Sequence, residues 1–249
     1  MKEIMVVLQR DFRELRQTNA FRILVIASVI VAFGAATGIS VTFRHQPWLS
    51  QESAQPILNL IIGIPAYFIS FFILLAFIWA FASLSITKEK VSGNIDSLLA
   101  TPLSPRSIWL AKTLAIFLPG FIVSGTASLI ILLGISYLVI VPAIGSIILP
   151  VPVLLITFLI NPLLFFGMLS FIVLFSLANN PDVAIAPSFL VGFGLMIGMP
   201  LGIMTGAINL ASWAFSLWYL AATIVVWVIV LWLTRLLTKE NIVLSSKGD

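Results

Sequence analysis

The sequence predicts an all-α membrane protein with six transmembrane helices, and three observations lead to that prediction. First, 61% of the 249 residues are hydrophobic and only 9% are charged, whereas an ordinary soluble domain is roughly 25% charged. Second, Asp182 is the only charged residue between Lys112 and Arg235, and so long an uncharged stretch is stable only in hydrocarbon. Third, the apolar runs are each long enough to cross a bilayer, which takes about 20 residues.

The whole chain, residues 1–249, is expected to form one membrane domain. Several predicted spans contain a proline, such as Pro65 and the pairs Pro119-Gly120 and Asn161-Pro162. Prolines are tolerated in membrane helices where neighbouring groups satisfy the freed carbonyls. The predicted spans cover residues 23–41, 57–84, 108–141, 147–177, 183–201 and 217–237.

The segment before the first span, residues 2–19, is predicted to be an amphipathic helix at the membrane surface. Arg10 and Asp11 are expected on its polar side. Because the following apolar run, residues 23–43, is long enough to span, we interpret it as a retained helix rather than a cleaved signal peptide. The apolar stripe consists of Ile4, Leu8, Phe12 and Leu15.

The basic residues indicate the orientation. With both chain ends in the cytoplasm, twelve of the thirteen Lys and Arg residues fall on the cytoplasmic side, and only Arg44 lies outside. Cytoplasmic loops carry such an excess of Lys and Arg. The pI near 9.7 therefore reflects membrane topology, and we expect no nucleic acid partner.

Residues 202–216 fit neither a span nor a solvated loop, because they are uncharged and apolar but follow the fifth span too closely. They are predicted to form short re-entrant or interfacial helices on the outer side, covered by protein.

The most informative segment is the predicted cytoplasmic loop at residues 85–107. Its apolar residues recur at helical spacing, which predicts a short helix with one apolar stripe. Thr101-Pro102 ends this helix, and Ser104 and Pro105 begin the next one as N-cap and first helical residue. The stripe faces either lipid or a partner protein, and the pattern alone leaves both open. It consists of Val91, Ile95, Leu98 and Leu99.

This loop resembles the signature loop of type-two ABC permeases, the exporter family of bacteria and archaea. Asn94 and Asp96 stand where that family more usually has Thr and Glu. The layout is also similar, with an interfacial helix, six spans and the loop after the second span. The matching residues are Glu89, Lys90, Gly93, Asn94, Asp96, Leu98, Leu99, Pro102 and, further on, Lys112.

The resemblance implies a permease subunit that is moved by a separate ATPase. Two permease chains, identical or different, would pair, and two ABC ATP-binding subunits would bind ATP and Mg below them. This chain has no GxxxxGK[ST] phosphate-binding loop, so we expect no catalytic residue and no cofactor in it. The coupling residues implied by the resemblance are Glu89, Lys90, Val91, Gly93, Ile95, Asp96, Leu98, Leu99 and Pro102.

Three other functions are conceivable for a membrane protein of this composition. An ion-coupled secondary transporter usually buries acidic residues within its spans, but Asp182 lies in a turn-like connection. A zinc enzyme needs a motif such as HExxH, and His45 with Glu52 does not supply one. A membrane scaffold of a cofactor-maturation system would have a similar sequence, so that alternative stays open.

The sequence says little about the substrate. The first, second and fifth spans are almost uncharged, which favours an apolar or amphipathic substrate over a free ion. The aromatic residues of the second span are interpreted as packing residues. Six glycines in the first and fifth spans and just after the fifth could permit close helix contact, including contact between paired chains: Gly34, Gly38, Gly192, Gly194, Gly198 and Gly202.

Overall fold

The computed structural model describes residues 2–51, 54–82, 103–178 and 181–238, together with residues 240 and 242. Every regular element in these ranges is helical, and six helices are long and apolar enough to cross a membrane. The helices are α1 (Lys2–Gln17), α2 (Asn19–Phe43), α3 (Gln55–Phe81), α6 (Pro105–Ile135), α7 (Val141–Ile144), α8 (Val151–Leu155), α9 (Asn161–Ala178), α10 (Pro181–Met204) and α11 (Trp213–Leu233). The predicted all-α membrane fold is confirmed.

Two π-helical turns join the shorter helices into full spans. The turn η3 (Ser136–Ile140) connects α6 to α7, and η4 (Ile156–Ile160) connects α8 to α9. The third and fourth spans therefore run without interruption over Pro105–Ile144 and Val151–Leu177. Short 3-10 turns lie at Pro47–Ser50 (η1) and Thr234–Leu236 (η5).

The ends of the elements differ from the predicted ones for local reasons. The N-terminal helix ends at Gln17 because Thr18 caps α2, its Oγ1 accepting a hydrogen bond of 3.2 Å from the backbone N–H of Phe21. The predicted fourth span began at residue 147, but Gly145, with φ of 73°, ends α7, and the next helix begins at Val151.

The re-entrant helices predicted within residues 202–216 are not formed. The helix α10 continues to Met204, residues 205–212 form a turn, and α11 begins at Trp213. Gly206 adopts φ of 74°, which only glycine reaches readily, and this reverses the chain. The side chain of Ile208 then folds onto Gly202, so this apolar segment is covered by its own turn.

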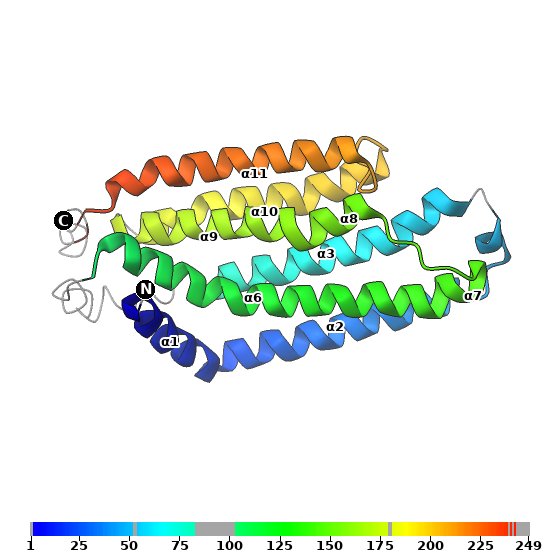
Figure 1. Cartoon of the computed structure of the whole chain (residues 1–249), viewed down its shortest axis with the longest axis horizontal. Coiled ribbons are helices and arrows are strands. Elements are labelled where there is room, and N and C mark those ends of the chain that lie inside the picture. Colours follow the sequence, from blue (N-terminus) through cyan, green and yellow to red (C-terminus); the bar gives the residue numbers. More distant parts are fainter. Residues whose placement is uncertain are drawn as a thin grey trace.

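Three spans form the centre of the bundle, and three lie outside them. In α3 and in the fourth span, which contains α9, 67% of the most apolar window is buried, whereas the values for α2, α10 and α11 are 22%, 17% and 22%. The helix α6 packs against α3, α2, α1 and α9, and α9 also packs against α10 and α11 (Figure 1). The outer helices thus turn most of their apolar side chains outward.

The two π-turns have the same local cause, a proline in the first turn of the helix that follows. Pro162 follows η4, and Pro142 follows η3. In η4 the N–H of Asn161 bonds the carbonyl of Ile156, five residues back. The next carbonyl in this pattern, that of Thr157, has no donor because Pro162 lacks an N–H group. Ser70 of α3 donates its hydroxyl to that carbonyl at 3.3 Å.

A chain of buried hydrogen bonds extends from this point to the last span. Asn161 Nδ2 donates to Ser70 Oγ at 3.3 Å, and Tyr219 of α11 donates to Asn161 Oδ1 at 3.0 Å. Since Tyr219 uses its hydrogen there, Tyr67 of α3 donates to the Tyr219 hydroxyl at 3.5 Å. The network connects α3, α9 and α11 in the apolar interior, where polar groups need protein partners.

This network predicts a measurable contribution of Tyr219 to stability. Tyr219→Phe removes the donor to Asn161 and the acceptor of Tyr67, so we expect the free energy of unfolding to fall by about 1 to 2 kcal/mol. Unfolding of the purified protein in mixed micelles measures this. The control is Tyr137→Phe, because Tyr137 is 59% exposed. Equal stability of the two variants would contradict the prediction.

Candidate coupling site

The last residue of α3, Phe81, and the first residue of α6, Pro105, lie at the end of the bundle that also carries α1 (Figure 1), and the predicted coupling loop falls between them in the sequence. The residues that the resemblance assigns to coupling lie outside the described residues, which stop at Ala82 and resume at Leu103. Their role stays a prediction. What the structure does describe is how the helix that follows the loop is held.

The first turn of α6 has the predicted start. Ser104 is the N-cap, and its Oγ accepts a hydrogen bond of 3.2 Å from the backbone N–H of Ser107. Pro105 occupies the first helical position, where a missing N–H costs nothing. Leu103, directly before the cap, is buried at 8% exposure. This prediction is confirmed, and the last residues before α6 are fixed against the protein.

A buried ion pair ties the second turn of α6 to the N-terminal helix. Lys112 Nζ lies 3.2 Å from Asp11 Oδ2, and the exposed fractions of the two side chains are 0% and 8%. Arg10 also contacts Asp11, with its guanidinium 2.9 Å from Oδ1. Burying a charge in a low-dielectric region is costly unless it is paired, so Lys112 depends on its carboxylate partner.

The buried face of α1 includes much of the predicted apolar stripe and also Asp11. Val7, Asp11 and Leu15 are buried, at the spacing i, i+4 and i+8, and Ile4 and Leu8 of the stripe pack against the core. The prediction that Asp11 lies on the polar side is wrong, because hydrophobicity alone cannot show that a lysine from a distant span pairs with the carboxylate. Asp11 is therefore the site residue that the sequence interpretation missed.

A second contact attaches the same part of α6 to another helix. Trp109 donates its indole N–H to the backbone carbonyl of Ser170 in α9 at 2.8 Å, and both residues are buried. Trp109 and Lys112 lie one turn apart on α6. The beginning of α6 is thus attached both to α1 and to α9.

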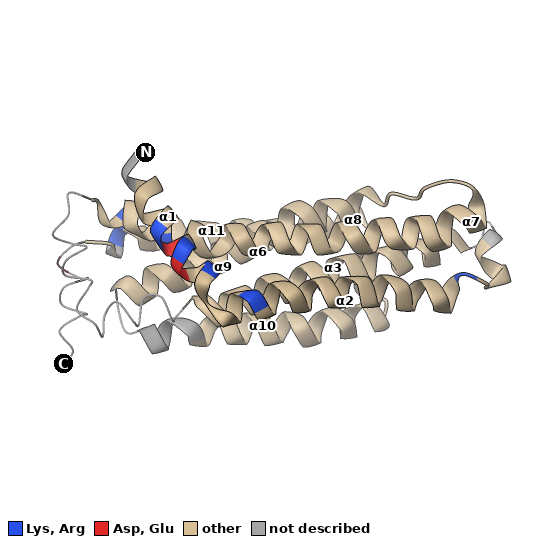
Figure 2. Ribbon diagram, turned by 90° about the horizontal axis from the view of Figure 1, so that it is seen from below, with Lys and Arg blue, Asp and Glu red and all other residues tan. Residues whose placement is uncertain are grey.

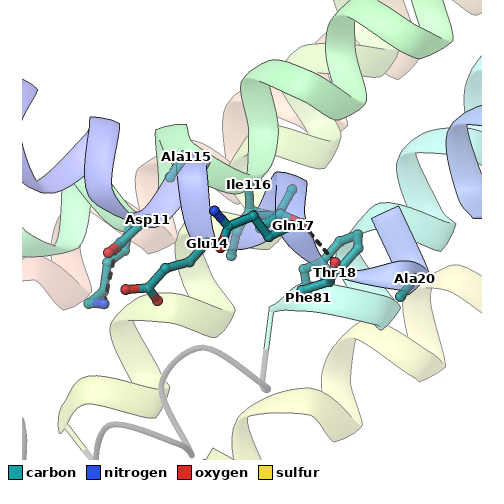
Figure 3. A pocket seen from close by; sticks show the side chains of 10 residues that line it. Asp11, Glu14, Gln17, Thr18, Ala20, Phe81, Ala115 and Ile116 are labelled. Atoms are coloured by element: carbon teal, nitrogen blue, oxygen red, sulfur yellow. Dashed lines mark hydrogen bonds and ion pairs between the residues drawn. The ribbon is translucent and has the colours of Figure 1, made fainter. Parts of the chain in front are cut away.

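A cavity of about 340 Å³ lies beside the ion pair, between α1, α2, α3 and α6 (Figure 3). One side carries polar groups, including Asp11, Glu14 and Thr18, and the other is apolar, with Phe81 and Ile116. Phe81 is the last residue of α3, so the cavity separates the end of α3 from α1. There is room here for α1 and the end of α3 to approach one another.

The charged residues that the structure describes occur mostly at this end of the bundle, in and near α1 (Figure 2). Arg44, which follows the far end of α2, lies at the opposite end. Within the described ranges, no group of three or more His, Cys, Asp and Glu side chains is placed to hold a metal ion. The contacts described at this site are an ion pair, a capped helix start and an indole hydrogen bond.

The family described as ABC-2 family transporter protein matches residues 7–195 of this chain. The match extends from α1 into α10, so it includes the ion pair, the loop region, four of the six spanning helices and the first part of the fifth. The chain belongs to this family and is the membrane-spanning permease subunit of an ABC transporter, a type of subunit that generally works with an ATP-binding subunit. Neither a curated protein nor a solved structure matches the chain.

The ion pair predicts a specific pattern of stability changes. Asp11→Ala removes the hydrogen bond between the Asp11 carboxylate and the buried Lys112 ammonium, and we expect the free energy of unfolding to fall by about 1.5 to 3 kcal/mol, the usual worth of a hydrogen bond to a charged group. Glu14→Ala is the control, because Glu14 is 71% exposed and its contact with Arg10 is 3.9 Å long; its effect should stay below about 0.5 kcal/mol.

The double variant Asp11→Leu with Lys112→Met removes both charges and should be more stable than Asp11→Ala. Unfolding of all variants in the same detergent measures these differences. If Asp11→Ala and Glu14→Ala had equal effects, the ion pair would not hold α1 to α6.

Proposed function

We propose that this permease subunit belongs to an ATP-driven exporter in the cytoplasmic membrane of a bacterium or archaeon. In this proposal the end of the bundle with α1 faces the cytoplasm, and a separate ATPase binds ATP and Mg there. Two ATPase copies and a second permease chain complete the transporter. The substrate is an apolar or amphipathic molecule, because the described faces of α2, α10 and α11 are apolar and largely exposed.

The observation that supports coupling is the double attachment of α6. The predicted coupling residues 89–102 lead directly into this helix, whose start is bonded to α1 through Lys112 and to α9 through Trp109. Force applied to the loop would therefore move three helices together. The ATPase would supply that force when its two copies close around ATP.

The observation that supports pairing of two permease chains is the open surface at four glycines. A Cβ atom built on Gly34, Gly38, Gly194 or Gly198 would meet no atom within 4 Å. Both pairs have the GxxxG spacing that allows two helix backbones to approach closely in a membrane. Gly192 and Gly202 are instead occupied inside the chain, by Leu75 with Trp79 and by Ile208.

The first test concerns the loop. We expect Ile95→Asp and Leu98→Asp to insert normally into the membrane but to lose the ATPase on co-purification, because a charge on the apolar stripe cannot enter a groove of the partner. Ser97→Asp places the same charge on the predicted polar face and should retain the ATPase. Unchanged capture by all three variants would indicate that the stripe faces lipid.

The second test concerns orientation. A cysteine introduced by Arg44→Cys should react with a membrane-impermeant maleimide in intact cells, because Arg44 would lie outside. One introduced by Ser92→Cys should react only after permeabilisation. The natural chain has no cysteine, so the background is clean. The opposite labelling pattern would reverse the proposed topology.

The third test concerns pairing. Gly194→Leu should reduce the paired fraction in detergent, measured by native mass spectrometry of the purified protein, because the leucine side chain separates the two backbones. Gly125→Leu is a matched control, since Gly125 also has no atom within 4 Å of a built Cβ but lies on α6. If both variants paired as the natural chain does, α10 would not be part of the contact.

The fourth test concerns the energy source for transport. Vesicles that contain the permease and its ATPase should move substrate only with ATP and Mg. Transport driven by an ion gradient without the ATPase would overturn the exporter assignment.

A further inference from the structure

A groove opens at the side of the helix bundle, where α10 and α11 both pack against α9. The helix α9 packs against each of them, whereas among the described residues α10 and α11 form no comparable contact with one another. The groove has a volume of about 160 Å³. Its floor includes Met168 and Phe171 of α9, and its walls include Val191 of α10 and Val226 of α11.

The groove exists because α10 presents short side chains at this level. Pro187, Ser188 and Val191 face it, and none of them reaches across to α11. The floor and one wall are deeply set, since Met168 is 5% exposed and Val230 is 0% exposed. The rim, by contrast, continues into the outward faces of the two helices, where Leu190 is 77% exposed and Val225 is 58% exposed.

Water is an unfavourable occupant of this groove. A dry cavity of about 150 Å³ lined by apolar side chains is known to take hydrocarbon rather than water, and here a single hydroxyl, that of Ser188, stands among the lining residues. Leaving the groove empty would forfeit the dispersion contacts of its lining. A whole helix, about 10 Å or more across, is too wide to enter it.

We propose that this groove is a binding site for one acyl chain of a bilayer phospholipid. The chain enters from the lipid-facing rim and lies against Met168 and Phe171 of α9, more deeply than any lipid at the ordinary surface. It fills the gap between α10 and α11 and thereby holds the two outer helices apart. This site is separate from the glycines proposed for pairing, because Gly194 and Gly198 do not line it.

The test is photolabelling of the full chain in phosphatidylcholine vesicles that contain a small fraction of phosphatidylcholine with a diazirine along one acyl chain. Adducts are located by peptide mass spectrometry. A seated chain labels Met168 and Phe171 on the floor of the groove in preference to Leu190 and Val225, although Met168 is 5% exposed and the latter pair is 77% and 58% exposed. Lipid at the ordinary surface only would give the opposite order, with labelling that follows exposure, and would overturn the proposal.

A matched pair of variants makes the result specific. Val191→Trp fills the groove from its rim, where residue 191 is already 43% exposed, and should abolish the adducts at Met168 and Phe171. Leu190→Trp adds the same bulk one residue away, outside the groove lining, and should leave them unchanged. Adducts that survive Val191→Trp, or adducts absent from the natural chain because a second copy covers the groove, would each overturn the proposal.

Discussion

Within the hydrocarbon of a bilayer, a backbone polar group has no water to bond and must find its partner inside the protein. The prolines show how this constraint shapes the interior. Pro162 removes the donor that the carbonyl of Thr157 would otherwise receive, the helix widens into a π-turn, and Ser70 of a neighbouring span supplies the missing hydrogen bond. The same serine then begins the network that reaches Tyr219, so satisfying one carbonyl joins three spans.

Buried charges need a partner inside the protein as well, and the Asp11–Lys112 pair is an example. A lysine one turn inside the start of a span is acceptable because the N-terminal helix folds over it and brings a carboxylate. This explains why α1 packs against protein through Val7, Asp11 and Leu15. In the mechanism we propose, α1 moves together with α6 when a partner ATPase displaces α6. The two helices stay together because breaking the buried Asp11–Lys112 ion pair would cost much free energy.

The outer helix α10 is apolar on every side, but its sides contact different surroundings. On α10, Gly192 packs against α3 inside the chain, Gly194 and Gly198 stay open, and Val191 borders the groove shared with α9 and α11. One helix thus has a side for its own bundle, a side proposed for a second permease chain, and a side proposed for an acyl chain. Such a division is consistent with an assembly whose outer helices shift against lipid while the central helices stay packed.

The membrane class, the six spans, the N-cap of α6 at Ser104 and the family could be predicted from local patterns, namely hydrophobicity, capping residues and the loop motif. Three features could not: the burial of Asp11, the hydrogen bond from Ser70 to the carbonyl of Thr157, and the turn at residues 205–212. Asp11 is buried because Lys112, about a hundred residues further along the chain, pairs with it, and the turn depends on the backbone angle of Gly206. Such features follow from tertiary contacts, because in a medium without water the energy of a polar group depends on which groups meet it in space.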